Sequence, residues 1–147
     1  MDDEPVKVMF PVEPGESGQP AITCEQLWCL PIGGDRFVVD NIPFYAREIS
    51  LEDEVEIHLR DGERWFVGVV NPSKNTTVRV FPRRSDAATA LTDRLRAFGG
   101  HTERMEGSEL LAISFPPSAD LSAALDYLDA ETAVGNVAFE ESSVRYR

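Results

Sequence analysis

The period with which apolar residues recur changes midway along this chain, and that change limits its possible folds more than any single motif. Before residue 72, short apolar runs alternate with polar residues and are separated by glycine and proline, as in short β-strands. Further on, apolar residues also recur at steps of three and four, as on one face of an amphipathic helix. The polar residues 71–75 separate the two patterns. We therefore predict two small lobes, residues 1–72 and residues 73–147.

The first lobe is predicted to be a small antiparallel structure resembling a β-barrel. Gly33 with Gly34 suits a hairpin turn, and Asp61 with Gly62 is a second hairpin signal. The segment 64–70 is apolar on both faces, which predicts a central strand. No helical period interrupts these segments, so a curled sheet or partly closed barrel is expected. The predicted strands are 6–10, 27–30, 36–39, 54–60 and 64–70.

The second lobe is predicted to contain strand, helix, strand, strand, helix and strand, in that order. Ser85 can cap the first helix, and Gly99 with Gly100 ends it. This order is the split βαβ arrangement of ferredoxin-like folds, with both helices on one face of a four-stranded sheet. The predicted class of the whole chain is therefore α+β. The strands expected in this lobe are 77–81, 101–106, 109–115 and 137–140.

The chain is strongly acidic. Its 147 residues include 26 Asp and Glu against 14 Lys and Arg, which gives a formal net charge of -12. Such a charge repels a phosphate backbone, so duplex nucleic acid is not expected as a ligand. No apolar run approaches the roughly 20 residues that span a bilayer. The first residues are acidic, whereas a secretion signal is basic and then apolar. We therefore expect a cytoplasmic protein without a membrane segment.

The sequence contains no recognisable catalytic or metal-binding motif. Cys24 and Cys29 would lie roughly 16 Å apart on an extended strand, beyond disulfide reach, so both are expected to be reduced. They offer only half of a zinc site, because His58 and His101 fall in different lobes. Small buried or half-buried thiols are expected, with metal or redox chemistry as the alternative. His58 is flanked by charged residues and is expected at the surface, with a general base as the alternative. Nucleophile-elbow, phosphate-loop and zinc-protease motifs are absent. We therefore predict no enzyme activity, metal or cofactor.

The densest charge feature is a group of carboxylates between residues 52 and 63. One interpretation is a solvated face that keeps the protein soluble. The functional interpretation is a docking surface for a basic protein, because opposite potentials speed encounter and exclude wrong partners. The residues predicted to bind such a partner are Glu52, Asp53, Glu54, Glu56, Asp61 and Glu63.

Three arginines lie around the predicted start of the first helix, and they form the best small-ligand candidate. Arg79, Arg83 and Arg84 could hold an anion together with the helix N-terminus. Asp86 lies two residues after Arg84 and could occupy the same terminus instead. Both possibilities remain open at this point.

The segment 40–47 combines turn-forming side chains, a proline and two neighbouring rings. Its notable residues are Asp40, Asn41, Pro43, Phe44 and Tyr45. Asp and Asn favour side-chain turns, and the residue before a proline is held extended. We expect this segment to anchor the first lobe, with a ligand or partner pocket as the alternative.

Three stretches carry a resemblance to a known family: segment 40–47, the opening run 6–11, and the pair Trp65 and Phe66. In these stretches the chain resembles a family of small bacterial proteins, the domain of unknown function 4265 family. Further similar stretches are 27–28, 77–80, 110–112, 116–117 and 140–141. The last strand has Val137, Ala138 and Phe139 where the family pattern would have a tryptophan. The resemblance implies a bacterial cytoplasmic protein of two small lobes, and it brings no activity and no catalytic residue.

Together these features predict a non-enzymatic protein-binding module. The concrete form is an acidic inhibitor, or an immunity-type partner, of a basic toxin or nuclease. The alternative is a small-ligand-binding regulatory domain with an anion site at the start of the first helix. Small size, high acidity, clustered carboxylates and missing catalytic motifs favour the first interpretation.

Overall fold

The computed structural model describes residues 4–12, 24–84 and 86–146, and these residues form two compact units. The units are Met1–Ser73 and Lys74–Arg147, so the division falls one residue from the predicted boundary. The described residues contain two sheets and two helices, which confirms the α+β class. Neither helix is long and apolar enough to cross a membrane.

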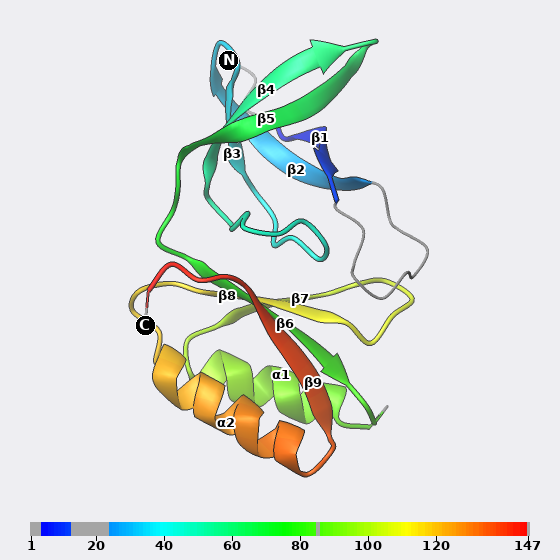
Figure 1. The fold of residues 1–147 in the computed structure, drawn as a ribbon, viewed down its shortest axis with the longest axis vertical. Coiled ribbons are helices and arrows are strands. Elements are labelled where there is room, and N and C mark those ends of the chain that lie inside the picture. The colour runs from blue at the N-terminus through cyan, green and yellow to red at the C-terminus, as the bar shows by residue number, and fades with distance from the viewer. Residues whose placement is uncertain (1–3, 13–23, 85, 147) are drawn as a thin grey trace. The chain divides into compact units, whose positions relative to one another are not determined.

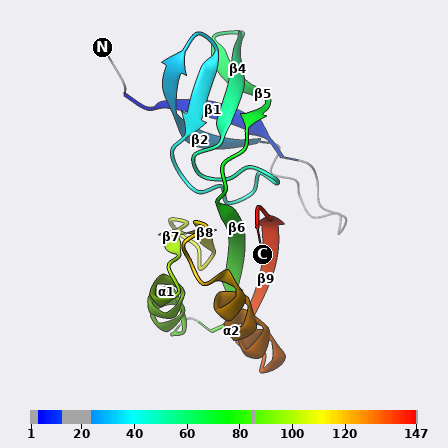
Figure 2. The same ribbon diagram turned by 90° about the vertical axis from the view of Figure 1, so that its left-hand side faces the viewer.

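The first unit is a five-stranded sheet that closes on itself (Figures 1 and 2). Successive strands pair antiparallel, and the ring closes where Met9 of the first strand pairs in parallel with Trp65 of the last. The strands are β1 (Val6–Pro11), β2 (Cys24–Gly33), β3 (Arg36–Val39), β4 (Glu54–Arg60) and β5 (Glu63–Asn71). The inward side chains of β1 to β4 alternate with outward ones, as the two-residue period requires.

Strand β5 differs from its prediction as a central strand. Phe66 stacks on Phe10 with ring centroids 4.8 Å apart and packs against the core. By contrast, Val67 is 51% exposed, and most other residues of β5 are exposed or half-buried. The pairing of β5 with β4 is interrupted by two register shifts, and its register with β1 consists of a single residue pair, Met9 with Trp65. Bulges and partial pairing leave apolar side chains in solvent that a central strand would have buried.

The second unit packs two helices on one face of a four-stranded antiparallel sheet (Figure 1). The strand order is β7-β8-β6-β9. Its core lies between the sheet and the helices, where Val78 and Val80 meet Leu91, Leu95 and Leu128. The elements are β6 (Thr76–Pro82), α1 (Ala88–Ala97), β7 (His101–Arg104), β8 (Leu111–Phe115), α2 (Leu121–Ala133) and β9 (Val137–Ser143).

The ends of the helices follow partly from local sequence signals. After α1, Gly99 adopts a φ of 100°, and its N–H donates to the Arg96 carbonyl at 2.9 Å, so the predicted glycine stop is confirmed. At its start, α1 has Ala87 in the cap position and no side-chain cap. The predicted cap, Ser85, lies outside the described residues. The second helix is capped by Asp120, whose carboxylate accepts from the Ala123 N–H at 3.1 Å.

Candidate functional site

Segment 40–47 is held in place by an inward-facing carboxylate on β2. Glu25 accepts hydrogen bonds from the backbone N–H groups of Phe44, Tyr45 and Ala46, at 2.7, 2.9 and 2.8 Å. Its side chain lies in phase with the buried Leu27, not on the outer face. Sequence reasoning missed Glu25, although the two-residue period of β2 places it inward.

A second pair of hydrogen bonds ties the same segment to β2. The Asn41 carboxamide oxygen accepts from the Trp28 N–H at 2.7 Å, and the Asp40 N–H donates to the Trp28 carbonyl at 2.8 Å. Pro43 is buried, and Phe44 and Tyr45 are half-buried. These contacts favour the interpretation of this segment as a structural anchor.

One residue of the predicted acidic docking surface is not on the surface. The side chain of Asp53 is in the interior, with 0% of the residue exposed. One carboxylate oxygen accepts from the Ser50 N–H at 2.9 Å, and the other accepts from the Ser73 N–H at 2.8 Å. The prediction that Asp53 contacts a partner is therefore wrong, because its charge is used inside the first unit.

The other five carboxylates are divided among different surroundings. Glu52 is exposed, and Glu54 is half-buried on β4. Glu56 lies 3.9 Å from the Arg36 guanidinium. Asp61 and Glu63 are exposed at the tip of the β4–β5 hairpin, where Arg60 pairs with Glu63 in the strand register. The six predicted residues therefore do not form one continuous acidic patch, because one is buried and basic side chains are interspersed.

The β4–β5 hairpin presents apolar side chains to solvent. Leu59 is 72% exposed and Val67 is 51% exposed. Val69 and Val70 are exposed as well, while Trp65 is half-buried beneath the guanidinium of Arg60, 4.4 Å from the ring centroid. We call Leu59, Val67, Val69 and Val70 the hairpin surface.

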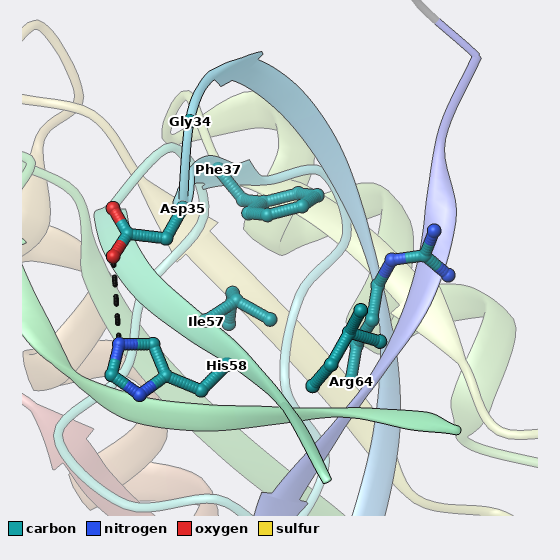
Figure 3. Close-up of a pocket in the computed structure, with 7 residues that line it drawn as sticks. Gly34, Asp35, Phe37, Ile57, His58 and Arg64 are labelled. Atoms are coloured by element: carbon teal, nitrogen blue, oxygen red, sulfur yellow. Dashed lines mark ion pairs between the residues drawn. The ribbon is translucent and has the colours of Figure 1, made fainter. Parts of the chain in front are cut away.

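A groove of about 510 Å³ lies beside this hairpin. In Figure 3, Asp35 and His58 point toward each other, while Phe37 and Ile57 lie between this pair and Arg64. Phe37 and Ile57 also belong to the core of the first unit. The lining residues are Gly34, Asp35, Phe37, Ile57, His58, Leu59 and Arg64. The groove therefore combines an apolar part with acidic and basic groups at its rim.

Three titratable side chains converge at the edge of this groove. The His58 Nε2 atom lies 2.6 Å from Glu56 Oε2 and 3.4 Å from Asp35 Oδ2. His58 is exposed, as predicted. Sequence reasoning placed it between solvated charges but did not bring Asp35 to it. The local signal was Glu56 and His58 on one face of a strand, whereas the pairing of β3 with β4 brings Asp35 to them.

The three arginines proposed for an anion site are not brought together. Arg79 lies on the sheet face opposite the helices, is 6% exposed, and contacts Glu140 across the strand pair at 3.2 Å. The Arg84 guanidinium lies 3.3 Å from the Asp86 carboxylate, an ion pair that differs from the sequence alternative of Asp86 at the helix N-terminus. The grouping of Arg79 with Arg83 and Arg84 at the start of α1 is therefore wrong, because strand alternation points Arg79 away from the helices.

The sequence profile of a family described as "Domain of unknown function (DUF4265)" matches residues 25–139, which begin at Glu25 and include the hairpin, the groove and segment 40–47. The chain belongs to this family. It is also similar to a solved structure described as "Novel crystal structure of a hypothetical protein from Neisseria gonorrhoeae". That match has 20% identity and a TM-score of 0.77, and it covers 100% of this chain and 99% of the other, which shows a shared fold. No curated protein matches.

The two cysteines of this DUF4265 chain are both free thiols, in agreement with the sequence. They lie five positions apart on β2, so their side chains occupy opposite faces of the strand. Cys24 is half-buried and Cys29 is buried. Burial, together with the nearby negative charge of Asp40, raises the pKa of Cys29 to about 12. The Cys29 thiol therefore stays protonated at neutral pH.

We expect a thiol-specific reagent at pH 8 to modify Cys24 quickly in the folded protein and Cys29 only after unfolding. The reason is that the thiolate is the reactive form, and Cys29 is both protonated and shielded. Mass spectrometry of labelled peptides measures the two rates, with protein in denaturant as the control. The pKa of Cys29 is higher in the folded than in the unfolded protein. The protonated thiol's contribution to the free energy of unfolding is therefore complete below pH 9 and is lost as pH rises through 12. Equal labelling rates in the folded protein would contradict this burial.

Proposed function

We propose that this DUF4265 chain is a non-enzymatic protein-binding module that contacts its partner through the hairpin surface. The observation that carries this proposal is the exposure of Leu59 at 72% and Val67 at 51% on adjoining strands. Large apolar side chains exposed beside charged groups are typical of protein interaction sites. The neighbouring groove gives a partner side chain a partly apolar place to dock.

The charge of the chain supports a cationic partner. The net charge is -12, and Glu52, Asp61 and Glu63 remain on the surface of the first unit. Opposite potentials would speed association and orient the partner, even though the carboxylates do not form one patch. The proposed form of the function is therefore an inhibitor, or immunity-type protein, for a basic toxin or nuclease. In this form, apolar contacts supply affinity and negative charge supplies steering.

Two further points belong to this proposal. The strand order of the second unit and its helix placement support a ferredoxin-like lobe, and the closed ring of the first supports a small barrel-like lobe. The two free thiols support a reducing compartment such as the bacterial cytoplasm.

An anion site at the start of α1 is not favoured, because Asp86 and Glu131 lie with Arg84 in the depression there.

The experiment compares two exposed apolar positions of nearly equal exposure. Immobilised wild-type protein captures partners from an extract of the bacterium that encodes it, and Leu59→Asp should retain about tenfold less of the same protein. The matched control is Val134→Asp, because Val134 is 70% exposed but lies in the second unit, directly after α2. We expect the control to capture the partner normally, and capture by wild type to weaken as salt is raised.

Three results would contradict the proposal. Equal capture by Leu59→Asp and wild type would exclude the hairpin surface. Loss of capture by Val134→Asp would place the contact elsewhere. An unchanged affinity at high salt would exclude the cationic partner. Thermal unfolding of each variant checks that both remain folded, as expected for substitutions at exposed side chains.

A further inference from the structure

The groups at the edge of the groove form a mixed nitrogen and oxygen donor set. Asp35, Glu56 and His58 each offer one ligand atom, and these three atoms all lie within 4.8 Å of one another. Two carboxylate oxygens and one imidazole nitrogen converge there from β4 and from the turn before β3. Figure 3 shows the pair formed by Asp35 and His58. Imidazole favours transition metals over Mg²⁺ or Ca²⁺, which prefer all-oxygen sites.

The backbone holds the three donors in register. Glu56 and His58 are two positions apart on β4, so they project from the same face of the strand. The Ile57 N–H, between them, donates to the Asp35 carbonyl at 2.8 Å and ties the turn to β4. Paired strands and a hydrogen-bonded turn therefore fix the backbone positions from which the three donor side chains extend.

Arg36 contacts the far oxygen of each carboxylate. Its guanidinium lies 3.8 Å from Asp35 Oδ1 and 3.9 Å from Glu56 Oε1, while Oδ2 and Oε2 face His58. A group that holds the outer oxygen of a ligating carboxylate orients the inner one. The two carboxylates and Arg36 leave one net negative charge, which still attracts a dication.

We propose that Asp35, Glu56 and His58 bind a divalent transition-metal ion of the Zn²⁺ type at the edge of the groove. The 3.4 Å between Asp35 Oδ2 and His58 Nε2 is close to the separation of two ligands at about 2.1 Å from a tetrahedral ion. The 2.6 Å contact between Glu56 and His58 opens by side-chain rotation, because His58 is exposed. Three protein ligands leave a position open toward the groove for water or for a ligating group of a bound molecule.

The test uses the full chain without an affinity tag and with Zn²⁺ as the probe. Competition with a chromophoric chelator should show one Zn²⁺ per chain, and His58→Ala and Glu56→Gln should each weaken binding by about tenfold or more. His101→Ala is the matched histidine control, because His101 is exposed on β7 of the second unit. Cys24→Ser controls for zinc on the half-buried thiol. Both controls should bind Zn²⁺ like the wild type.

A second measurement on the wild-type protein requires no variant. Adding Zn²⁺ should shift the imidazole NMR signals of His58 and leave those of His101 in place. If no Zn²⁺ bound at about 1 mM, the proposal would be overturned, because a dissociation constant above that concentration is too weak for a specific metal site. It would also be overturned if His58→Ala bound normally or if Cys24→Ser abolished binding. The three side chains would then be an exposed ion-pair cluster only.

Discussion

Replacing Glu25 with alanine should lower the free energy of unfolding by about 4 kcal/mol, because three backbone N–H groups lose a charged acceptor. Each such bond contributes roughly 1.5–3 kcal/mol, and the three are not fully additive. The released segment 40–47 also exposes the buried Ile42 and Ala46. Urea unfolding followed by tryptophan fluorescence measures the change, since both tryptophans, Trp28 and Trp65, lie in the first unit.

The neighbouring residue on β2 supplies the matched control. Gln26 points outward, so Gln26→Ala should change stability by less than about 0.5 kcal/mol. Glu25→Gln should fall between the two, because an amide keeps one acceptor oxygen. If Glu25→Ala cost no more than Gln26→Ala, Glu25 would not be the anchor of segment 40–47. Faster hydrogen exchange at the amides of Phe44, Tyr45 and Ala46 in Glu25→Ala would show where the loss arises.

Local signals were sufficient for much of the fold. The strand Arg36–Val39 has the predicted bounds, because a glycine turn fixes its start. The stop of α1 at Gly99 follows from the one residue type that enters the left-handed region at no steric cost. The alternation of helical and extended periods also gave the order of elements in the second unit. Each of these signals acts within a few residues.

The inward carboxylates show where residue type misled the interpretation. Asp53 is in phase with the buried Val55 and Ile57, and Glu25 is in phase with the buried Leu27. The two-residue period therefore places both inward, but their charge suggested the surface. What makes burial possible is a set of backbone N–H donors from distant segments, and no local pattern encodes those donors.

The candidate metal site and the exposure of β5 depend on long-range register. His58 meets Asp35 because β3 and β4 pair so that the turn before β3 lies beside His58. The apolar side chains of β5 indicated burial on both faces, yet bulges and a single pairing with β1 leave Val67 in solvent. Strand register across a closed sheet is set by the whole unit, so a single strand could not predict either feature.

Asp53→Asn should lower the free energy of unfolding by about 3 kcal/mol, whereas Glu52→Gln should change it by less than about 0.5 kcal/mol. Both substitutions remove one negative charge from adjacent positions. In Asp53 each carboxylate oxygen accepts from a different backbone N–H, of Ser50 and of Ser73, so an amide must turn its NH₂ group toward one of these donors. Glu52 is exposed, so its charge is already solvated. Urea unfolding followed by tryptophan fluorescence measures both variants.

The variants Asp53→Asn and Glu52→Gln also decide between a structural and a docking role for these two residues. If Asp53 has a structural role, its buried carboxylate cannot contact a partner. Asp53→Asn should then bind the captured partner with unchanged affinity at a temperature where the variant is folded. Glu52→Gln removes an exposed charge, so it should slow association modestly and reduce the salt dependence. If Asp53→Asn kept full stability but lost partner binding, the continuous acidic docking surface read from the sequence would be right, and the buried position of Asp53 would be wrong.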